Sequence, residues 1–308
     1  MDPDSRRPGR PLLYYAMGGG LGHLTRALAV AAELDRHGAS LRILASSSLA
    51  PLVMASSGFP IDHIAGDKTE SRQGYYGFLS DYIERHQFKL IILDAFPFGI
   101  VGEFLALSQD IPRVLIARSL RWGGYADMIN LKAGGHCRYP SRSLIIEPLD
   151  GKYEAVLKEQ SDAASLDEPI LDGGFCRPDG AGTRGLQERC AVIHSGDGRE
   201  RDTLIRYAND VLREEGISAP VDTVFPDRNI YPADDLLASY RYVVSGAGYN
   251  MAARASQAGP SRRHYLYPFD RKFDDQHGRK MNIESGLWKN AKPDGARKAA
   301  RWIMDLTG

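Results

Sequence analysis

The chain has 308 residues, 43% of them hydrophobic and 25% charged, which is typical of a globular protein and enough for two domains of about 150 residues. Its 39 basic and 39 acidic side chains give a formal net charge of zero, so it lacks the positive surplus of a typical nucleic-acid-binding protein. Cys137, Cys176 and Cys190 have neither the number nor the spacing of a disulfide framework or a zinc site, which favours a reducing cytoplasm. No apolar segment has the length of a signal peptide or a membrane span, and peripheral contact with a membrane stays open.

Short apolar runs alternate with segments of helical periodicity along the first half of the chain. Strands are predicted at residues 12–17, 41–45, 90–93, 114–117 and 144–146, and helices at 23–36 and 74–87. The run at 90–93 is apolar throughout, as in a strand that is buried on both faces of a sheet. Strands that alternate with helices indicate a parallel sheet flanked by helices.

The same alternation restarts after a polar stretch at residues 150–167. Strands are predicted at residues 190–193, 221–225, 242–244 and 265–266, and helices at 203–215, about 250–258 and 294–306. We therefore predict an α/β protein of two Rossmann-like, parallel-sheet domains, residues 1–150 and 151–308. The last helix is expected to pack back on the first domain.

A glycine-rich loop, GGGLGH at residues 18–23, joins the first predicted strand to the first predicted helix. Gly19, Gly20 and Gly22 allow a sharp turn and the close approach of a ligand beyond the carboxyl end of the strand. The spacing fits neither a dinucleotide fingerprint nor a P-loop, which would end in Gly-Lys-Ser/Thr. His23 can take up a proton near neutral pH, so it is a candidate general base. A packing or helix-capping role for His23 is the alternative.

This loop and the LTRALA segment at residues 24–29 resemble the amino-terminal motif of GT-B glycosyltransferases. The likeness is to the bacterial group of the peptidoglycan lipid-linked N-acetylglucosaminyltransferase and to predicted glycosyltransferases near it. The segment LDAFPFG at residues 93–99 resembles the same group, in which an acid ends a central strand. The resemblance implies two such domains facing a cleft, His23 as the catalytic base, and Asp94 as the carboxylate that orients it. Otherwise Asp94 would cap a helix that begins near Phe98.

A second small-residue turn, SGAGYN at residues 245–250, separates a predicted strand from a predicted helix. Gly246, Gly248, Tyr249 and Asn250 would leave backbone N–H groups exposed at the helix start, a place that suits a diphosphate. The resemblance supports this interpretation, because that group has a Ser/Gly-rich turn here that leads into an alanine-rich helix and Ala-Gly-Pro, residues 258–260 of this chain.

The resemblance also implies further donor-binding residues in the second half. Asp275 and Gln276 would read the hydroxyls of the donor sugar, although an Asp-Asp-Gln triplet also suits the start of a helix. Ser195 and Gly196, at the end of the first strand of the second domain, would lie against the donor phosphates. Arg254 is a departure, since related enzymes have a glutamate there that binds the ribose hydroxyls. An arginine cannot accept hydrogen bonds and would instead hold a phosphate or a carboxylate.

These implications describe an inverting, metal-independent glycosyltransferase without a cofactor. It would move a sugar from a nucleoside-diphosphate sugar, a UDP-sugar first of all, to a hydroxyl or another nucleophile of a small-molecule or lipid-linked acceptor. One alternative keeps the fold but changes the reaction to that of a nucleotide-sugar hydrolase or 2-epimerase. The other alternative is a non-catalytic nucleotide-binding partner subunit, which the departure at Arg254 would mark.

Overall fold

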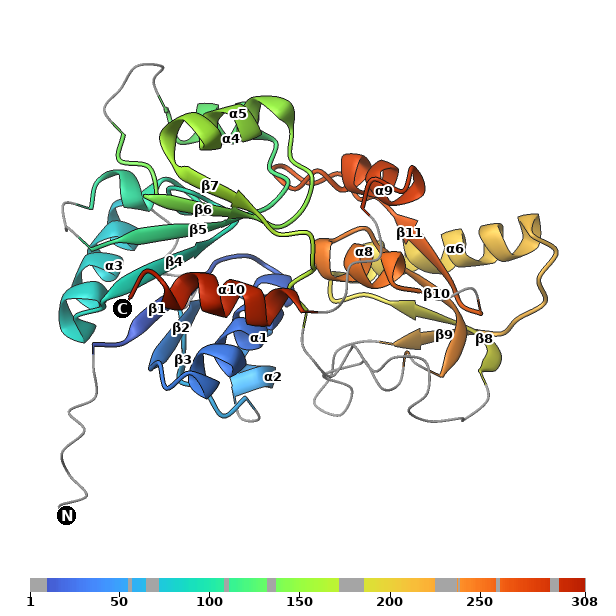
Figure 1. Ribbon diagram of the computed structural model, residues 1–308. Helices are drawn as coiled ribbons and strands as arrows, with labels where there is room; N and C mark the ends of the chain where they lie inside the picture. The colour runs from blue at the N-terminus through green and yellow to red at the C-terminus, as the bar shows by residue number, and fades with distance from the viewer. Residues whose placement is uncertain are drawn as a thin grey trace, which may run out of the picture. The chain divides into compact units, whose positions relative to one another are not determined.

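The computed structural model describes residues 10–54, 57–64, 72–107, 111–131, 137–171, 186–224, 237, 239–258, 261–288 and 294–307. The chain forms two compact units (Figure 1). Unit 1 comprises Met1–Ile170 and Asp294–Gly308, and unit 2 comprises Leu171–Pro293. The predictions made for Cys176, for residue 225 and for residues 259–260 lie outside the described residues.

Unit 1 is built on a parallel sheet that has seven strands in the described part of the chain, in the order β3-β2-β1-β4-β5-β6-β7. The strands are β1 (Leu12–Ala16), β2 (Leu41–Ala45), β3 (Ile61–His63), β4 (Leu90–Asp94), β5 (Arg113–Ala117), β6 (Arg142–Ile145) and β7 (Asp162–Ser165). Every residue of β1, β4 and β5 is buried. Apart from Asp94 at the end of β4 and Arg113 at the start of β5, these strands are apolar, as burial on both faces requires, which is why the sequence predicted them within two residues.

The helices of unit 1 are α1 (Gly22–Arg36), α2 (Ala50–Met54), α3 (Arg72–His86), α4 (Trp122–Met128), α5 (Gly151–Gln160), α10 (Gly295–Met304) and the short 3-10 helix η2 (Glu103–Leu105). α1 buries Leu24, Ala27, Ala31 and Leu34, which recur at helical spacing along one face. Gly38, with φ of +76°, follows the end of this helix in the left-handed region that glycine tolerates.

The last helix, α10, packs against α1 and so belongs to unit 1, as Figure 1 shows for the red and blue helices. Its first residue, Gly295, lies against the chain that leaves β7. A side-chain carbon on Gly295 would come within 2.5 Å of the carbonyl carbon of Pro169, so only glycine fits. Lys298 forms an ion pair with Glu168 beside this contact.

The division predicted at residue 150 is too early, because α5 and β7 are part of unit 1. β7 pairs with β6 at the edge of the first sheet. Asp150 is the N-cap of α5, and its side chain accepts the N–H groups of Lys152 and Tyr153. β7 has the sequence DAAS and no buried residue, so the segment looks like a polar linker in the sequence.

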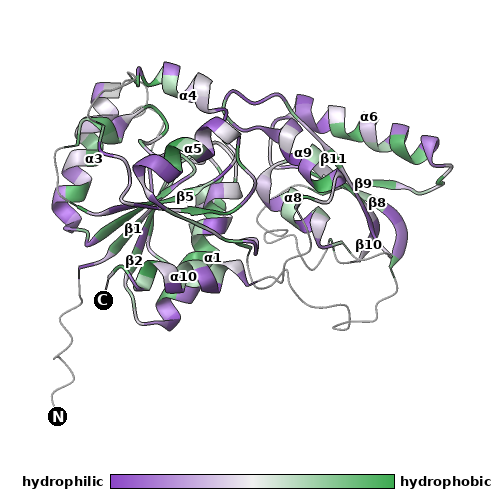
Figure 2. Ribbon diagram, turned by 45° about the horizontal axis from the view of Figure 1, so that its top comes forward, coloured by the Kyte–Doolittle hydropathy of each residue, from purple (hydrophilic) through white to green (hydrophobic). Residues whose placement is uncertain are grey.

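Unit 2 has a parallel sheet of four described strands in the order β11-β10-β8-β9. Its described elements are β8 (Gln187–Ile193), α6 (Gly198–Glu214), β9 (Val221–Val224), β10 (Tyr240–Gly246), α8 (Tyr249–Ser256), β11 (Arg263–Tyr267) and α9 (Gln276–Glu284). Hydrophilic and hydrophobic residues alternate along α6 (Figure 2), and its apolar side, Leu204, Ala208 and Leu212, packs on the core. α6 begins five residues before the predicted start, at Gly198 instead of 203, because Asp197 caps it.

In both sheets the order of strands reverses between two neighbours. In unit 1 the chain proceeds from β1 to β3 on one side and from β4 to β7 on the other, and in unit 2 the reversal lies between β8 and β10. Ligands of such sheets bind beyond the carboxyl ends of the two strands at this switch point. None of the helices in the described ranges is long and apolar enough to cross a membrane.

Candidate active site

His23 and Asp94 meet at the switch point of unit 1. His23 is the second residue of α1, directly after the glycine loop of β1, and Asp94 is the last residue of β4. Nδ1 of His23 lies 3.1 Å from Oδ2 of Asp94. The side chain of His23 is 16% exposed, whereas that of Asp94 is fully buried. The alternative that Asp94 caps a helix near Phe98 is wrong, because residues 95–102 form bends and turns and no helix starts near Phe98.

The glycine loop holds the imidazole in this place. A side-chain carbon on Gly18 would lie 2.8 Å from Nε2 of His23, so residue 18 must be glycine for the ring to stay where it is. The N–H of Gly18 donates to Ser46 Oγ at 3.0 Å and ties the loop to the end of β2. A side-chain carbon on Gly19, in contrast, would meet nothing within 4 Å.

A third residue of the site, Arg26, escaped the sequence analysis. It follows His23 by three positions on α1, and its side chain is fully buried. Its Nε and Nη2 lie 3.1 Å and 2.9 Å from Asp94 Oδ1, and Nη2 also lies 2.8 Å from Oδ2. The available signal was an arginine one turn after a candidate base, in a helix face that is otherwise apolar.

These contacts determine the protonation of the site. Burial opposes the ionisation of Asp94, but Arg26 and His23 outweigh it and lower the pKa of the carboxyl to about 2. Burial also lowers the pKa of His23; Asp94 works against this effect, and Arg26 and Arg118 add to it. His23 is therefore a neutral imidazole at neutral pH. We assign its proton to Nδ1, donated to Asp94, which leaves Nε2 free to accept a proton.

The loop after β4 is held by buried side chains. Ala95 has φ of +71°, an unusual conformation for a residue with a side chain. Glu103 accepts two backbone N–H groups of this loop at 2.9 Å and 3.0 Å, and the hydroxyl of Tyr125 donates to the carbonyl of Gly99 at 2.6 Å. The ring of Phe96 lies 6.2 Å from that of His23, at an interplanar angle of 15°. The loop thus fixes both the carboxylate and an aromatic neighbour of the base.

The switch point of unit 2 brings together the loops after β8, β10 and β11. Gly248 precedes α8 as its N-cap and offers no side-chain cap. Gly246 lies under the ring of Phe269, which a side-chain carbon would approach to 3.2 Å. Tyr249 and Asn250 are buried, and Tyr249 packs on Trp288 with ring centroids 5.4 Å apart. No side-chain cap therefore covers the start of α8 at Gly248, while the two larger residues anchor the first turn.

Ser195 and Gly196 lie beside a charged cluster that the sequence did not predict. Glu200 accepts from His194 Nε2 at 2.6 Å and from Arg271 Nη2 at 2.8 Å. Because Asp197 caps α6 and Glu200 lies in its first turn, two carboxylates already occupy the positive end of this helix dipole. They disfavour a phosphate at the start of α6, and Arg271 is the cation of this cluster.

Asp275 and Gln276 have structural partners. Asp275 caps α9 and accepts the N–H of Gly278 at 3.1 Å. Gln276 is buried, accepts the N–H of Phe269 at 3.1 Å and donates to Asp274 Oδ2 at 3.1 Å. Asp274, the first residue of the same Asp-Asp-Gln triplet, has a side chain that is 29% exposed and also accepts from Arg279. An acid at a helix start can serve as a cap or as a ligand, and the sequence cannot separate the two.

Arg254 lies on α8, with Nη1 donating to the sulfur of Met251 at 3.4 Å. The charge of Arg254 acts on His264 in β11. Burial lowers the pKa of His264 to about 3, and the charges of Arg254 and Arg262 add to this effect. Nε2 of His264 lies 2.8 Å from Ser245 Oγ. Arg254 therefore lies near enough to His264 to disfavour protonation of its imidazole.

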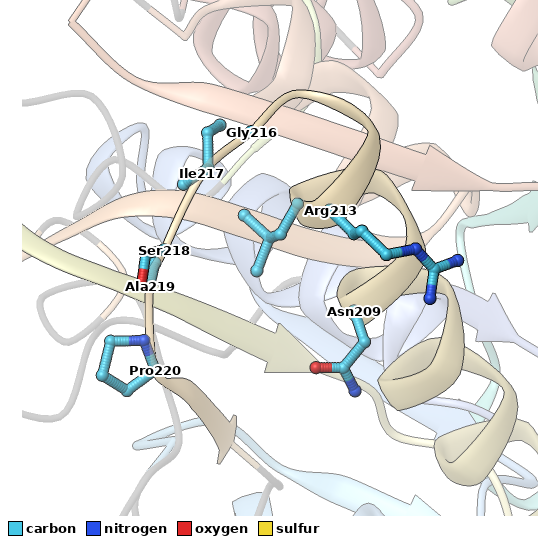
Figure 3. Close-up of a pocket in the computed structure, with 8 residues that line it drawn as sticks. Asn209, Arg213, Gly216, Ile217, Ser218, Ala219 and Pro220 are labelled. Atoms are coloured by element: carbon cyan, nitrogen blue, oxygen red, sulfur yellow. The ribbon is translucent and has the colours of Figure 1, made fainter.

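A hollow of about 590 Å³ in unit 2 lies away from these loops (Figure 3). It is formed by the end of α6 and the turn before β9, with the lining residues Asn209, Leu212, Arg213, Gly216, Ile217, Ser218, Ala219 and Pro220. Since Pro220 directly precedes β9, the hollow is at the amino edge of the sheet, opposite the strand ends that bind ligands. It contains none of the predicted site residues. Within the described ranges, no three His, Cys, Asp or Glu side chains are grouped as metal ligands.

No protein-family model matches the sequence, and neither does any curated protein. Solved structures match nearly the whole chain. The Streptomyces sp. SF2575 glycosyltransferase SsfS6, in complex with thymidine diphosphate, is 12% identical with a TM-score of 0.56, covering 96% of this chain and 91% of that one. Acinetobacter baumannii MurG is 12% identical with a TM-score of 0.51, covering 97% and 91%. A UDP-GlcNAc 2-epimerase from Neisseria meningitidis bound to UDP-GlcNAc is 10% identical with a TM-score of 0.56, covering 96% and 99%.

These matches, with the two parallel-sheet units, confirm the predicted fold class: the chain has the GT-B fold. Glycosyltransferases of nucleotide sugars and UDP-GlcNAc 2-epimerases share this fold. Likeness at this level of identity defines the architecture and leaves the reaction to be argued from the site.

Proposed function

We propose that the protein is an inverting glycosyltransferase that moves a sugar from a nucleoside-diphosphate sugar to a hydroxyl, or another nucleophile, of an acceptor without a metal ion. The observation that carries this proposal is the 3.1 Å contact between His23 and Asp94 at the switch point of unit 1. It provides a neutral imidazole with one nitrogen oriented by a carboxylate and the other able to take a proton.

In the proposed reaction, Nε2 of His23 removes the proton of the acceptor hydroxyl while its oxygen attacks the anomeric carbon. The bond from that carbon to the diphosphate oxygen breaks on the opposite face, so the configuration inverts. The charge of Asp94 stabilises the imidazolium that forms, through the proton on Nδ1. A positioned base of this kind contributes about 10²–10⁴-fold to the rate.

Unit 1 would bind the acceptor and unit 2 the donor. The departing nucleoside diphosphate gains negative charge, which suits the start of α8 after Gly248, where no side chain caps the helix, and the guanidinium of Arg271. The complexes of structural neighbours with thymidine diphosphate and UDP-GlcNAc support UDP- and TDP-sugars as the first donors to test.

The test of the base is His23→Ala, measured with a panel of UDP- and TDP-sugars and acceptors. We expect kcat to fall by about 10²–10⁴-fold, while the Kd of the donor, measured by calorimetry, stays within about twofold. NMR of the product should show the anomeric configuration inverted, and added EDTA should leave the rate unchanged. Transfer at the wild-type rate by His23→Ala would show that His23 is not the base.

The likeness to a UDP-GlcNAc 2-epimerase over 96% of the chain supports a second candidate, epimerisation or hydrolysis of the donor. Incubation of the donor without any acceptor separates the two. Rapid formation of free sugar or of the 2-epimer would favour the second candidate, whereas a donor that stays intact until acceptor is added supports transfer. Binding of a nucleotide with no turnover on the whole panel would favour a partner subunit.

A further inference from the structure

We propose that Arg26 is a positioning residue of this site, which fixes the carboxylate of Asp94 and offsets part of the charge that His23 would otherwise meet. The kinetic part of this inference rests on the proposed function, but its effect on His23 can be measured without any substrate. The site then consists of three residues, because Asp94 contacts both His23 and the buried guanidinium of Arg26.

The geometry supports a specific role for Arg26. Its guanidinium contacts both oxygens of Asp94, at 2.8–3.1 Å, and neither side chain is exposed. α1 is described along its whole length, and Arg26 is the one charged residue among the eight that it buries. A buried ion pair is expensive to desolvate and often adds no stability over apolar residues of similar size. A role in the site gives a reason for a charge at this position.

The arrangement also places opposite charges at similar distances from the imidazole. Asp94 Oδ2 is 3.1 Å and Arg26 Nη2 is 3.5 Å from Nδ1 of His23. A lone carboxylate at this distance would stabilise the imidazolium, while the adjacent guanidinium destabilises it. The pKa of His23 is lowered first of all by burial; Asp94 opposes this effect, and Arg26 offsets part of the opposition.

The other elements that surround His23 contribute a cation, an aromatic ring and backbone. Beyond β5, Arg118 contributes a further positive charge, and its Nε lies 3.6 Å from Glu147 beyond β6. From the loop after β4, Phe96 presents an aromatic ring, and from the loop after β1, Gly18 presents backbone. Asp94 is thus the carboxylate that acts on His23, and Arg26 is the cation that holds it.

Two substitutions should therefore shift the protonation of His23 in opposite directions. In Arg26→Met the carboxylate is no longer balanced, so the pKa of His23 should rise by about one unit or more, a tenfold change in proton affinity. In Asp94→Asn the guanidinium is no longer balanced, so the pKa should fall below that of the wild type. If Arg26 only supported the fold, both variants would be less stable than the wild type, but the pKa of His23 would not shift in opposite directions.

The experiment is an NMR titration of the histidine side chains in the full chain, with the His23 signal assigned by its loss in His23→Gln. The variants are Arg26→Met, Arg26→Lys and Asp94→Asn. Arg113→Met is the control, because Arg113 is also buried but donates to the carbonyls of Phe104 and Arg138 at the amino end of β5. We expect an upward shift in Arg26→Met, a smaller one in Arg26→Lys, a downward shift in Asp94→Asn and none in the control.

If Arg26→Met does not fold, Arg26→Gln removes the same charge, keeps a hydrogen-bond donor and must show the same upward shift. The inference is overturned if the pKa of His23 stays unchanged in Arg26→Met and Arg26→Gln, or if it shifts there in the same direction as in Asp94→Asn. If the protein is a transferase, the acidic limb of kcat/KM should move with the NMR value, while the Kd of the donor stays constant. The predicted shifts without any transfer would uphold the role of Arg26 and count against the proposed function alone.

Discussion

Replacing Gly18 by alanine adds one methyl group directly behind the imidazole of His23. The new carbon would lie 2.8 Å from Nε2 and even closer to Cδ2, whereas carbon atoms in contact need about 3.5–4.0 Å. The ring must therefore move by roughly 1 Å, which removes it from hydrogen-bonding distance of Asp94. A displacement of this size in a catalytic group costs about 10²-fold in rate.

Gly151→Ala, at the start of α5 and outside the glycine loop, is the control, because a side-chain carbon there meets nothing within 4 Å. Neither glycine has a positive φ, so alanine fits the backbone at both positions. Steady-state kinetics should show kcat about 10²-fold lower in Gly18→Ala and close to wild type in Gly151→Ala, with donor KM similar in both. Calorimetric unfolding would establish that both variants are folded. The reasoning is refuted if a folded Gly18→Ala keeps the wild-type kcat, or if both variants lose activity equally.

Two further predictions concern donor binding and the end of the chain. Arg271→Met should raise the KM of the donor by about 10-fold or more, because it removes a cation from the diphosphate and leaves Glu200 unbalanced. Arg263→Met, at the amino end of β11, should leave KM unchanged, and equal effects in the two variants would refute the assignment of Arg271 to the donor site. Gly295→Ala should destabilise unit 1 by about 1–3 kcal/mol, because α10 must move away from Pro169. Gly77→Ala, inside α3 with open space around it, should stabilise the protein by about 0.5–1 kcal/mol. Chemical denaturation measures both changes, and a change of the same sign in the free energy of unfolding of Gly295→Ala and Gly77→Ala would contradict this account.

The sequence was sufficient to predict the strands at the centre of each sheet, because burial on two faces demands continuous apolar runs such as residues 90–93. It was insufficient at the edges. Ile61–His63 has three residues, and Asp162–Ser165 has no buried side chain, so neither segment has a pattern that distinguishes it from a loop. The missed strand β7 is also why the first domain was ended too early.

For the candidate site, the glycine loop after the first strand pointed to His23, and the resemblance of residues 93–99 to GT-B glycosyltransferases pointed to Asp94; their catalytic roles stay predictions. It missed Arg26 because arginine is usually exposed, and only the three-dimensional structure reveals its buried partner. The same holds for Arg271 and Glu200, which are 71 residues apart in the chain and form an ion pair through side chains alone. Long-range ion pairs of this kind leave no periodic trace in a sequence.

The close packing of Gly295 on Pro169 also has a consequence for the connectivity of the protein. The chain leaves unit 1 after Ile170 and returns to it at Asp294, and these two crossing points lie side by side. Unit 2 is therefore an insertion with adjacent ends, placed between β7 and the helix that covers α1. Segments with adjacent ends can be exchanged without stretching the host. Residues 171–293 thus form an inserted segment that could be replaced while the unit that carries His23, Asp94 and Arg26 stays intact.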